Sequence, residues 1–332
     1  MNRKRILNIL LWAVAVIVTV YSGAYFAVQK AQLLKDDDNH NTNEITQSDG
    51  YLSISFEGKE YEYNQSITTL TFMGVDGDQG DPLSGQSDFM DLIVFNRDDK
   101  KISQLLIPRD TMALVYEYDS DGNVVKAFTS QIAVAYPFGG SSPSARARNA
   151  LRSISAMLNG ILLDHYVVLP LNILPDLVDV FGETDIVLED DSLSHIDDKY
   201  VTGYAYHIDK ESIETFLKSR DINEEYSATA RLNRQQLYLD FVLNSLNKLN
   251  EGDLDLSLSK LVELLDKCSS NLTRGSIENY LNYFKEYKEN GIDRYRVPGS
   301  VQKPDKFDEF IIDRSAFDGI IVKIFYKEKR GR

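Results

Sequence analysis

The sequence predicts an α/β protein, a three-layer sandwich with a mixed central β-sheet, preceded by one transmembrane helix. Residues 6–28 contain no charged side chain. Beyond them, apolar strand-like runs alternate with segments of helical periodicity, as in βα units. Residues 90–96 and 101–107 flank a short polar turn, which is typical of an antiparallel pair. Antiparallel hairpins combined with βα units indicate a mixed sheet with helices packed on it.

The composition is that of a globular protein, and it excludes some functions. The chain has 332 residues, 43% of them hydrophobic and 26% charged. Its formal net charge of -15 argues against binding duplex nucleic acid, since that affinity comes largely from Lys and Arg on phosphates. Cys268 is the single cysteine, so neither an intrachain disulfide nor a CxxC site can form.

The N-terminal segment is predicted to be a membrane anchor. At about 1.5 Å per residue, residues 6–28 reach roughly 34 Å, enough to cross the hydrocarbon core. Basic residues occupy positions 3–5 and acidic residues positions 36–38, so the positive-inside rule places residues 1–5 in the cytoplasm. We therefore expect a single-pass cell-membrane protein. The alternative is a signal peptide cleaved near Ser22-Gly23-Ala24, which also puts the folded part outside the cytoplasm.

The rest of the chain divides into three further segments. Residues 29–50 are polar and are predicted to form an extracytoplasmic tether. Residues 51–65 form a short accessory segment, with a hairpin around Glu57-Gly58. Residues 66–332 form the catalytic domain, which opens with a strand at 67–75. The paired strands 90–96 and 101–107 follow, and Pro108 ends the second of them.

Helices and strands then alternate. A helix is expected over 143–159, because Ser142 suits its N-cap, Pro143 its first turn and Gly160 the position after its end. The remaining expected elements are a strand at 161–169, a short helix at 174–181, a strand at 184–188, a helix from Asp209 to about 219, a long helix at 228–249, helices near 256–268 and 276–288, and one strand or helix within 310–326.

The first candidate site follows the opening strand. Asp76 lies in Gly74-Val75-Asp76, and Asp88 ends Gly85-Gln86-Ser87-Asp88. Carboxylates in a loop after a buried strand suit Mg²⁺, which takes one or two carboxylates and completes its shell with water and phosphate oxygens. A calcium loop is the weaker alternative, because no EF-hand pattern closes here. A solvated acidic loop remains the plain alternative.

The second candidate site is Arg109-Asp110, directly after the strand that Pro108 ends. An arginine at a strand end reaches the rim of the sheet, where open α/β folds bind ligands. The alternative is a structural pair between Arg109 and a nearby carboxylate. Asp110 is a candidate general base, although pairing with Arg109 would keep it structural.

The third candidate site gathers cations from two segments. Lys218 and Arg220 precede the long helix, and Arg231, Arg234 and Gln235 share one of its faces at i, i+3 and i+4. Cations near a helix N-terminus oppose the macrodipole, so their clustering indicates a bound anion. Guanidinium groups fit a pyrophosphate. The alternative is a helix face that is paired with acidic neighbours at 221, 224 and 225.

These segments, in this order, resemble the LytR-CpsA-Psr family of cell-wall glycopolymer transferases, as a divergent member. The resemblance covers about Ser66 to the C-terminus. It rests on Gly74-Val75-Asp76, Gly85-Gln86-Ser87-Asp88, Ile107-Pro108-Arg109-Asp110, Ala135-Tyr136-Pro137-Phe138-Gly139-Gly140 and Arg231-Leu232-Asn233-Arg234-Gln235-Gln236. Each motif is weak alone, but five in the family's order are specific.

The resemblance implies a phosphotransferase that moves a glycopolymer from a polyprenyl-pyrophosphate carrier to a hydroxyl of peptidoglycan or a similar wall acceptor, at the membrane. The implied metal is Mg²⁺ (or Mn²⁺), on Asp76 and Asp88. Arg109, Arg220, Arg231 and Gln235 would contact the phosphates. The implied substrate-binding residues are Lys218, Arg234, Asp110 and Gln131.

The sequence departs from the family pattern at four positions. Gln86 and Lys218 stand where arginines are expected, Gln131 replaces a lysine and Ala228 replaces an aspartate. A second reading is therefore a non-catalytic, membrane-anchored binder of lipid-linked glycan or of a wall-assembly partner. A serine hydrolase is excluded for lack of a G-x-S-x-G elbow, and the four histidines show no metal-binding spacing.

Overall fold

The computed structural model describes residues 46–47, 50–78, 80–221, 223–224, 227–249, 254–287, 290–303 and 307–329. The predicted cytoplasmic end, the anchor at 6–28 and most of the tether lie outside these residues. Within the described part of the chain, no helix is both long enough and apolar enough to cross a membrane.

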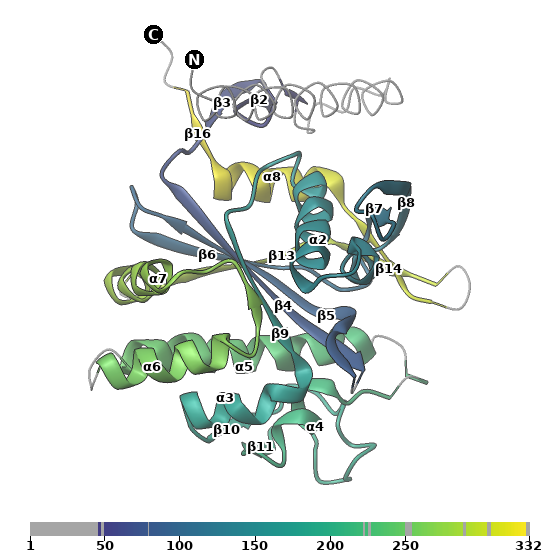
Figure 1. The fold of residues 1–332 in the computed structure, drawn as a ribbon, viewed down its shortest axis with the longest axis vertical. Helices are drawn as coiled ribbons and strands as arrows, with labels where there is room; N and C mark the ends of the chain where they lie inside the picture. Colours follow the sequence, from purple (N-terminus) through teal and green to yellow (C-terminus); the bar gives the residue numbers. More distant parts are fainter. Residues whose placement is uncertain are drawn as a thin grey trace, which may run out of the picture. The chain divides into compact units, whose positions relative to one another are not determined.

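The centre of the folded unit is a six-stranded mixed sheet, as the sequence predicts (Figure 1). Its strands, in spatial order, are β12 (Ser269–Ser270), β9 (His165–Pro170), β4 (Ile67–Asp78), β5 (Asp81–Asn96), β6 (Lys101–Leu106) and β13 (Ile292–Arg296). The β9–β4 and β6–β13 pairs are parallel, and the other pairs are antiparallel. The predicted pair around the polar turn is confirmed, with Asn96 opposite Lys101.

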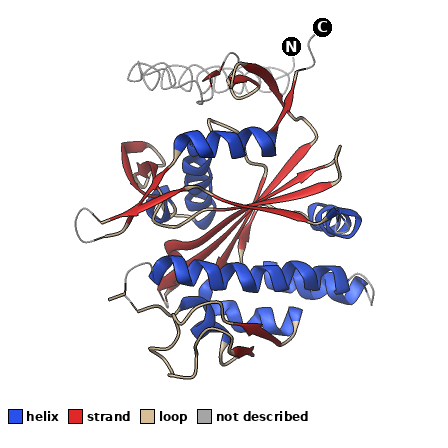
Figure 2. Ribbon diagram, turned by 180° about the vertical axis from the view of Figure 1, so that it is seen from behind, coloured by secondary structure: helices blue, strands red, loops and turns tan. Residues whose placement is uncertain are grey.

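Helices cover both faces of this sheet, as the opposite views in Figures 1 and 2 show. One face carries α2 (Pro143–Met157) and α8 (Arg314–Phe325). The other carries α5 (Ser227–Leu249), α6 (Leu254–Leu265) and α7 (Arg274–Tyr287), with α3 (Leu174–Phe181) and α4 (Ile213–Lys218) packed against α5. The short 3₁₀ helices are η1 (Ile132–Ala135), η2 (Pro137–Gly139) and η3 (Leu171–Ile173).

The alternation of side chains along β4 explains why apolar residues of this strand point to both faces of the sheet. Met73 and Val75 pack into the core shared with α2 and α8. Leu70 and Phe72 pack toward α5 and α7 on the other face. A strand that is buried on both faces needs apolar residues at successive positions, and this is the pattern from which the opening strand was predicted.

Smaller sheets lie around this centre. They comprise the hairpins β7 (Met112–Tyr118) with β8 (Val124–Gln131), β10 (Thr184–Val187) with β11 (Ala205–Ile208), and β14 (Gly299–Gln302) with β15 (Glu309–Ile312), and the sheet β1 (Thr46–Gln47), β2 (Ser53–Phe56), β3 (Lys59–Tyr63) and β16 (Tyr326–Glu328). The predicted turn at Glu57-Gly58 is confirmed, since both residues have positive φ, 50° and 75°. The accessory segment pairs with the C-terminal strand through Tyr63 and Tyr326.

The structure differs from the predicted elements in several places. The β7–β8 hairpin and strands β11, β13 and β14 were not predicted. Strands β11, β13 and β14 are too short or too polar to show apolar alternation, whereas β7 is apolar and could have been predicted. The region 310–326 contains both a strand and a helix. Most important for the site, β5 begins at Asp81, so the segment at 85–88 is part of a strand and not the expected loop.

Gly85 allows β4 and β5 to approach closely beside Asp76. A Cβ atom at residue 85 would lie 1.7 Å from the backbone oxygen of Asp76, and no side-chain movement could relieve that clash. The two strands therefore pair tightly at this point only because residue 85 has no side chain.

We expect Gly85→Ala to destabilise the protein by about 1–3 kcal/mol, as overpacking does elsewhere. Urea unfolding monitored by far-UV circular dichroism would measure the loss. Gly80→Ala is the matched control in the same hairpin, because nothing lies within 4 Å of a Cβ built there. Equal stability of the two variants would contradict the role assigned to Gly85.

Candidate functional site

Two adjacent strands bring the predicted acidic pair together. Asp76 lies near the end of β4, and Asp88 lies on β5. Gly74 is opposite Phe89 and Val75 is opposite Ser87, so Asp88 is the extra residue of a β-bulge. Bulges re-aim side chains and are common beside active sites. The bulge sets Asp88 toward the end of the sheet where Asp76 also lies.

Asp88 binds two arginines that come from distant segments. Arg109, in the turn after β6, donates from Nη1 to Asp88 Oδ1. Arg231, on α5, donates from Nη1 to Asp88 Oδ2 over 3.2 Å. Asp88 and Arg231 are only 9% and 6% exposed. One nearly buried carboxylate thus holds a guanidinium on each of its oxygens, which fixes the position of both cations.

Two further cations lie beside this triad. Lys218, at the end of α4, places Nζ 3.1 Å from Asp76 Oδ1. Arg220 is near enough to influence the pKa values of both Asp110 and Arg231. Residues from the three candidate sites of the sequence therefore converge at one end of the sheet.

Burial and like charges make this cluster electrostatically unfavourable. Burial lowers the pKa of the Arg231 guanidinium, and the neighbouring Arg220 and Arg109 lower it further, whereas Asp88 and Asp110 raise it. Burial likewise raises the pKa of the Asp110 carboxyl, against the opposing effect of Arg109 and Arg220. Such perturbed groups are concentrated at functional sites. Three guanidinium groups this close together suit a ligand with several negative oxygens.

Arg109 makes its main contacts away from Asp110. Its Nη2 donates to Gln86 Oε1, while its Nε lies 3.5 Å from Asp110 Oδ1. The expected pair with Asp110 is thus present but long. Asp110 Oδ1 instead accepts a 2.9 Å hydrogen bond from Gln131 Nε2, which also donates to the carbonyl oxygen of Asp308.

Arg234, which the resemblance implies is a substrate-binding residue, makes its contacts within the protein. It is 2% exposed and donates to the carbonyl oxygens of Phe216 and Ser219 and to Ser192 Oγ. Burial lowers its pKa to about 10. Because it fixes the segment that carries Lys218 and Arg220, its placement is that of a positioning residue. Shared helix spacing alone could not distinguish it from Arg231.

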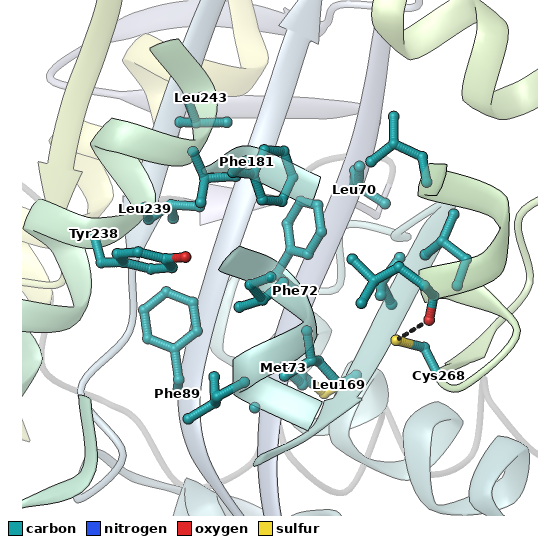
Figure 3. A pocket seen from close by; sticks show the side chains of 18 of the residues that line it. Leu70, Phe72, Met73, Phe89, Leu169, Phe181, Tyr238, Leu239, Leu243 and Cys268 are labelled. Atoms are coloured by element: carbon teal, nitrogen blue, oxygen red, sulfur yellow. Dashed lines mark hydrogen bonds between the residues drawn. The ribbon is translucent and has the colours of Figure 1, made fainter. Parts of the chain in front are cut away.

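Gln235 lies between two cavities. Its Nε2 donates to the carbonyl oxygen of Leu217 over 3.0 Å, and its side chain lines both spaces. The larger is an apolar cavity of about 220 Å³ between the sheet and helices α3, α5, α6 and α7, shown in Figure 3. The smaller is a cleft of about 20 Å³ that contains the arginine cluster.

The boundary between these cavities has polar atoms without partners. Within the described residues, Gln235 Oε1 and Tyr238 Oη are buried and accept or donate no hydrogen bond. Figure 3 shows the Tyr238 hydroxyl directed into the apolar cavity. Buried polar groups are nearly always paired, so unpaired ones here indicate a ligand with polar atoms. Tyr238 was missed from the sequence, although it lies three residues after Gln235 on the same helix face.

The acidic residues could hold a metal ion only together with other ligands. Among the described residues, no group of three or more His, Cys, Asp or Glu side chains is placed to hold one. Asp76 and Asp88 provide two carboxylates on adjacent strands. That donor set fits a Mg²⁺ ion that completes its octahedron with water and substrate phosphate oxygens.

On this mixed α/β sheet, an apolar cavity and a cleft lined by two arginines share Gln235, an arrangement that suits an amphiphile with an anionic head. The model of the LytR_cpsA_psr family matches residues 20–323. The chain therefore belongs to the LytR-CpsA-Psr family, as its motifs predicted.

Solved structures share the fold. Protein gbs0355 from Streptococcus agalactiae is 21% identical, with a TM-score of 0.63 over 78% of this chain and 86% of that one. B. subtilis TagV is 18% identical, with a TM-score of 0.60 over 78% of this chain and 96% of that one. YwtF (TagT) with bound octaprenyl pyrophosphate lipid is 15% identical, with a TM-score of 0.53 over 79% and 90%. No curated protein gives a significant sequence match.

All four departures from the family pattern lie at this site. Gln86 accepts from Arg109, and Lys218 pairs with Asp76. Gln131 bridges Asp110 and Asp308, and Ala228 lines the small cleft. Gln86, Gln131 and Ala228 therefore change the charge around the site, Lys218 keeps it, and the arginine–carboxylate centre is unchanged.

A second buried carboxyl lies three residues beyond Asp88. Asp91 is fully buried on β5 and accepts a 3.2 Å hydrogen bond from Gln104 Nε2. Burial raises its pKa to about 8, the Gln104 bond opposes that rise, and Asp240 adds to it. The folded protein thus keeps a proton that the unfolded chain releases above a pH of about 4.

This linkage predicts a pH dependence of stability. The contribution of Asp91 is complete below a pH of about 4 and is lost as the pH rises toward 8, by roughly 1.4 kcal/mol per pH unit. Asp91→Asn removes the linkage, so the variant should gain stability relative to the parent as the pH rises. Urea unfolding at several pH values would measure this. Parallel curves for the two proteins would contradict it, and exposed Asp121→Asn should follow the parent.

Proposed function

We propose that this protein is a phosphotransferase that moves a glycopolymer from a polyprenyl-pyrophosphate carrier to a hydroxyl of peptidoglycan or a similar wall acceptor. The observation that carries the proposal is that Gln235 lines both the apolar cavity and the cleft that Arg109 and Arg231 line. Such a site matches one ligand with a long apolar tail and an anionic head.

Successive residues of helix α5 would face successive parts of that ligand. Leu239 and Leu243 line the apolar cavity, Arg231 and Gln235 line the boundary, and Ala228 lines the far side of the cleft. At about 1.5 Å per residue, residues 228 to 243 span roughly 22 Å. A prenyl chain would lie along the C-terminal part of this span, with its diphosphate at Arg231. The related YwtF (TagT), described with bound octaprenyl pyrophosphate lipid, supports this order.

The diphosphate would enter by exchange with a carboxylate. Arg109 and Arg231 both pair with the single carboxylate of Asp88, which leaves this triad with a net positive charge. When phosphate oxygens arrive, the guanidinium groups can turn to them and release Asp88. Asp88 and Asp76 could then hold Mg²⁺ (or Mn²⁺), which would neutralise charge on the phosphates. Arg109, Arg220 and Arg231 would stabilise the charge that develops on the phosphoryl oxygens during transfer.

The proposal also covers the acceptor of the transfer and the location of the protein in the cell. A wall hydroxyl attacks the phosphorus nearest the glycan, and polyprenyl phosphate leaves. A lipid-linked donor requires the site to lie at a membrane surface. The uncharged segment 6–28 would anchor the chain there, with residues 66–332 outside the cytoplasm.

Replacing Arg231 tests the transferase. With Mg²⁺, a lipid-pyrophosphate glycan and a soluble peptidoglycan fragment, the protein should release polyprenyl phosphate. Arg231→Ala should slow that release by about 10²–10³-fold, the usual loss when one preorganised charge is removed from a transition state. Thin-layer chromatography of the labelled lipid would measure it.

Arg274→Ala is the matched control, because Arg274 pairs only with Glu278 on an exposed helix face and should leave the rate unchanged. Tight lipid binding without any release by the parent protein would contradict the proposal. That result would favour a non-catalytic binder, the function consistent with the four changed positions around the site.

A larger side chain in the apolar cavity should weaken lipid binding without reducing the stability of the fold. Leu239 lines the cavity on α5 (Figure 3). Leu239→Trp places a ring in space that the prenyl chain would occupy, so binding of a prenyl pyrophosphate should weaken by about tenfold or more. Fluorescence titration would measure the affinity, and thermal unfolding should show an unchanged or higher midpoint. Unaltered affinity in a folded variant would contradict placement of the lipid in this cavity.

A further inference from the structure

We infer that Asp110 accepts the proton of the acceptor hydroxyl, which enters the small cleft between Asp110 and the hairpin β14–β15. This inference rests on the proposed function and identifies the acceptor side and the base of the same site. Asp110, Asp308, Val301 and Phe310 line the cleft on the side formed by the turn after β6 and by the hairpin.

The in-line geometry of phosphoryl transfer determines the side of the cleft from which the acceptor hydroxyl enters. The attacking and leaving oxygens lie roughly in line across the phosphorus. The leaving polyprenyl phosphate lies toward Gln235 and the apolar cavity, along α5. The acceptor must therefore approach from the opposite end of the cleft, near Ala228 and the hairpin. Asp110 and Asp308 are the acidic residues that line this end. Gln131 orients the carboxylate of Asp110 but only the backbone carbonyl of Asp308, and Asp88 is assigned to the metal ion in the proposed function.

The fold holds Asp110 rigidly. The turn is closed by the Thr111 amide and hydroxyl, which both donate to the carbonyl oxygen of Pro108. The Phe310 amide donates to the Asp110 carbonyl oxygen over 2.9 Å, which attaches the hairpin to the turn. Gln131 Nε2 then joins the Asp110 carboxylate to the Asp308 carbonyl. The carboxylate therefore has a fixed orientation relative to the cleft.

The cleft cannot admit a whole acceptor sugar. Its volume is about 20 Å³, far less than a sugar ring needs. The acceptor sugar would lie outside, against the hairpin, and insert one hydroxyl toward Asp110.

The chemical step balances without any further reactant. The acceptor oxygen forms a bond to the phosphorus that carries the glycan, and its proton passes to Asp110. The bond from that phosphorus to the bridging oxygen of the diphosphate breaks, and polyprenyl phosphate leaves with the electron pair. The Asp110 proton then returns to solvent. A base works best when its pKa is near the working pH.

The charged groups that face Asp110 set its basicity. Arg109, Arg220 and Arg231 lower its pKa, Asp308 raises it, and burial, the largest effect, raises it above the ordinary value. Gln131 supplies a hydrogen bond without adding charge. The glutamine that replaces the family's lysine therefore leaves Asp110 a stronger base than a lysine at 131 would.

Two variants test the inference in the release assay described for Arg231. Asp110→Asn should lower kcat by about 10²-fold or more, while affinity for prenyl pyrophosphate changes by less than about threefold. Gln131→Lys places a cation beside Asp110, so the acid limb of the pH–rate profile should move by about one unit to lower pH. A purely structural role for Asp110 would not move that limb. Exposed Asp121→Asn is the control for both and should behave as the parent.

The outcomes separate this inference from the proposed function. If the parent releases polyprenyl phosphate but Asp110→Asn keeps its kcat, or the acid limb is unmoved in Gln131→Lys, Asp110 is not the base and the transferase stands. If the parent releases none, the proposed function fails and the inference fails with it. Should Asp110→Asn not fold, the Gln131→Lys profile decides alone.

Discussion

The double ion pair of Asp88 with Arg109 and Arg231 is the interaction on which the site depends. It joins a central strand, the turn after β6 and the long helix α5, and it keeps two guanidinium groups within a nearly buried cluster. Burial of such charges is unfavourable unless each is paired. Asp88 supplies the pairing in the free protein, and the bulge at this position provides the orientation that the pairing needs.

The residues around this triad fix the segments that carry the other charged groups of the site. Arg234 and Gln235 bind backbone carbonyls at the end of α4 and so fix the segment that carries Lys218 and Arg220. Gln131 and the β14–β15 hairpin fix Asp110 on the other side. Each cation of the site attracts a nearby carboxylate, but the cations repel one another. The contacts above nevertheless keep them close enough to bind a single anion. A ligand with several negative oxygens would relieve that repulsion.

Under the proposed function, the apolar cavity would give the neighbouring arginine cluster selectivity for amphiphiles. Helices α3, α5, α6 and α7 leave a space against the sheet that their own side chains do not fill. A protein interior is normally close-packed, so a cavity of this size lined by apolar side chains reduces stability unless a ligand fills it. The unpaired Tyr238 hydroxyl and Gln235 oxygen mark the point at which that ligand becomes polar. Membership of the LytR-CpsA-Psr family is in agreement with such a site.

The sequence by itself determined the local elements and the chemistry of the site: the apolar opening strand, the capped helix at Ser142, the motifs that carry Asp76, Asp88, Arg109 and Arg231, and the cationic segment with Arg220. These follow from neighbouring residues, through side-chain period, caps and turn types. Only the tertiary structure decided that Asp88 sits in a bulge, that Arg234 turns to the backbone while Arg231 turns to Asp88, and that the hairpin β14–β15 closes the far side. Each of these depends on contacts between segments far apart in the chain, and no local pattern encodes the partner that a buried guanidinium will find.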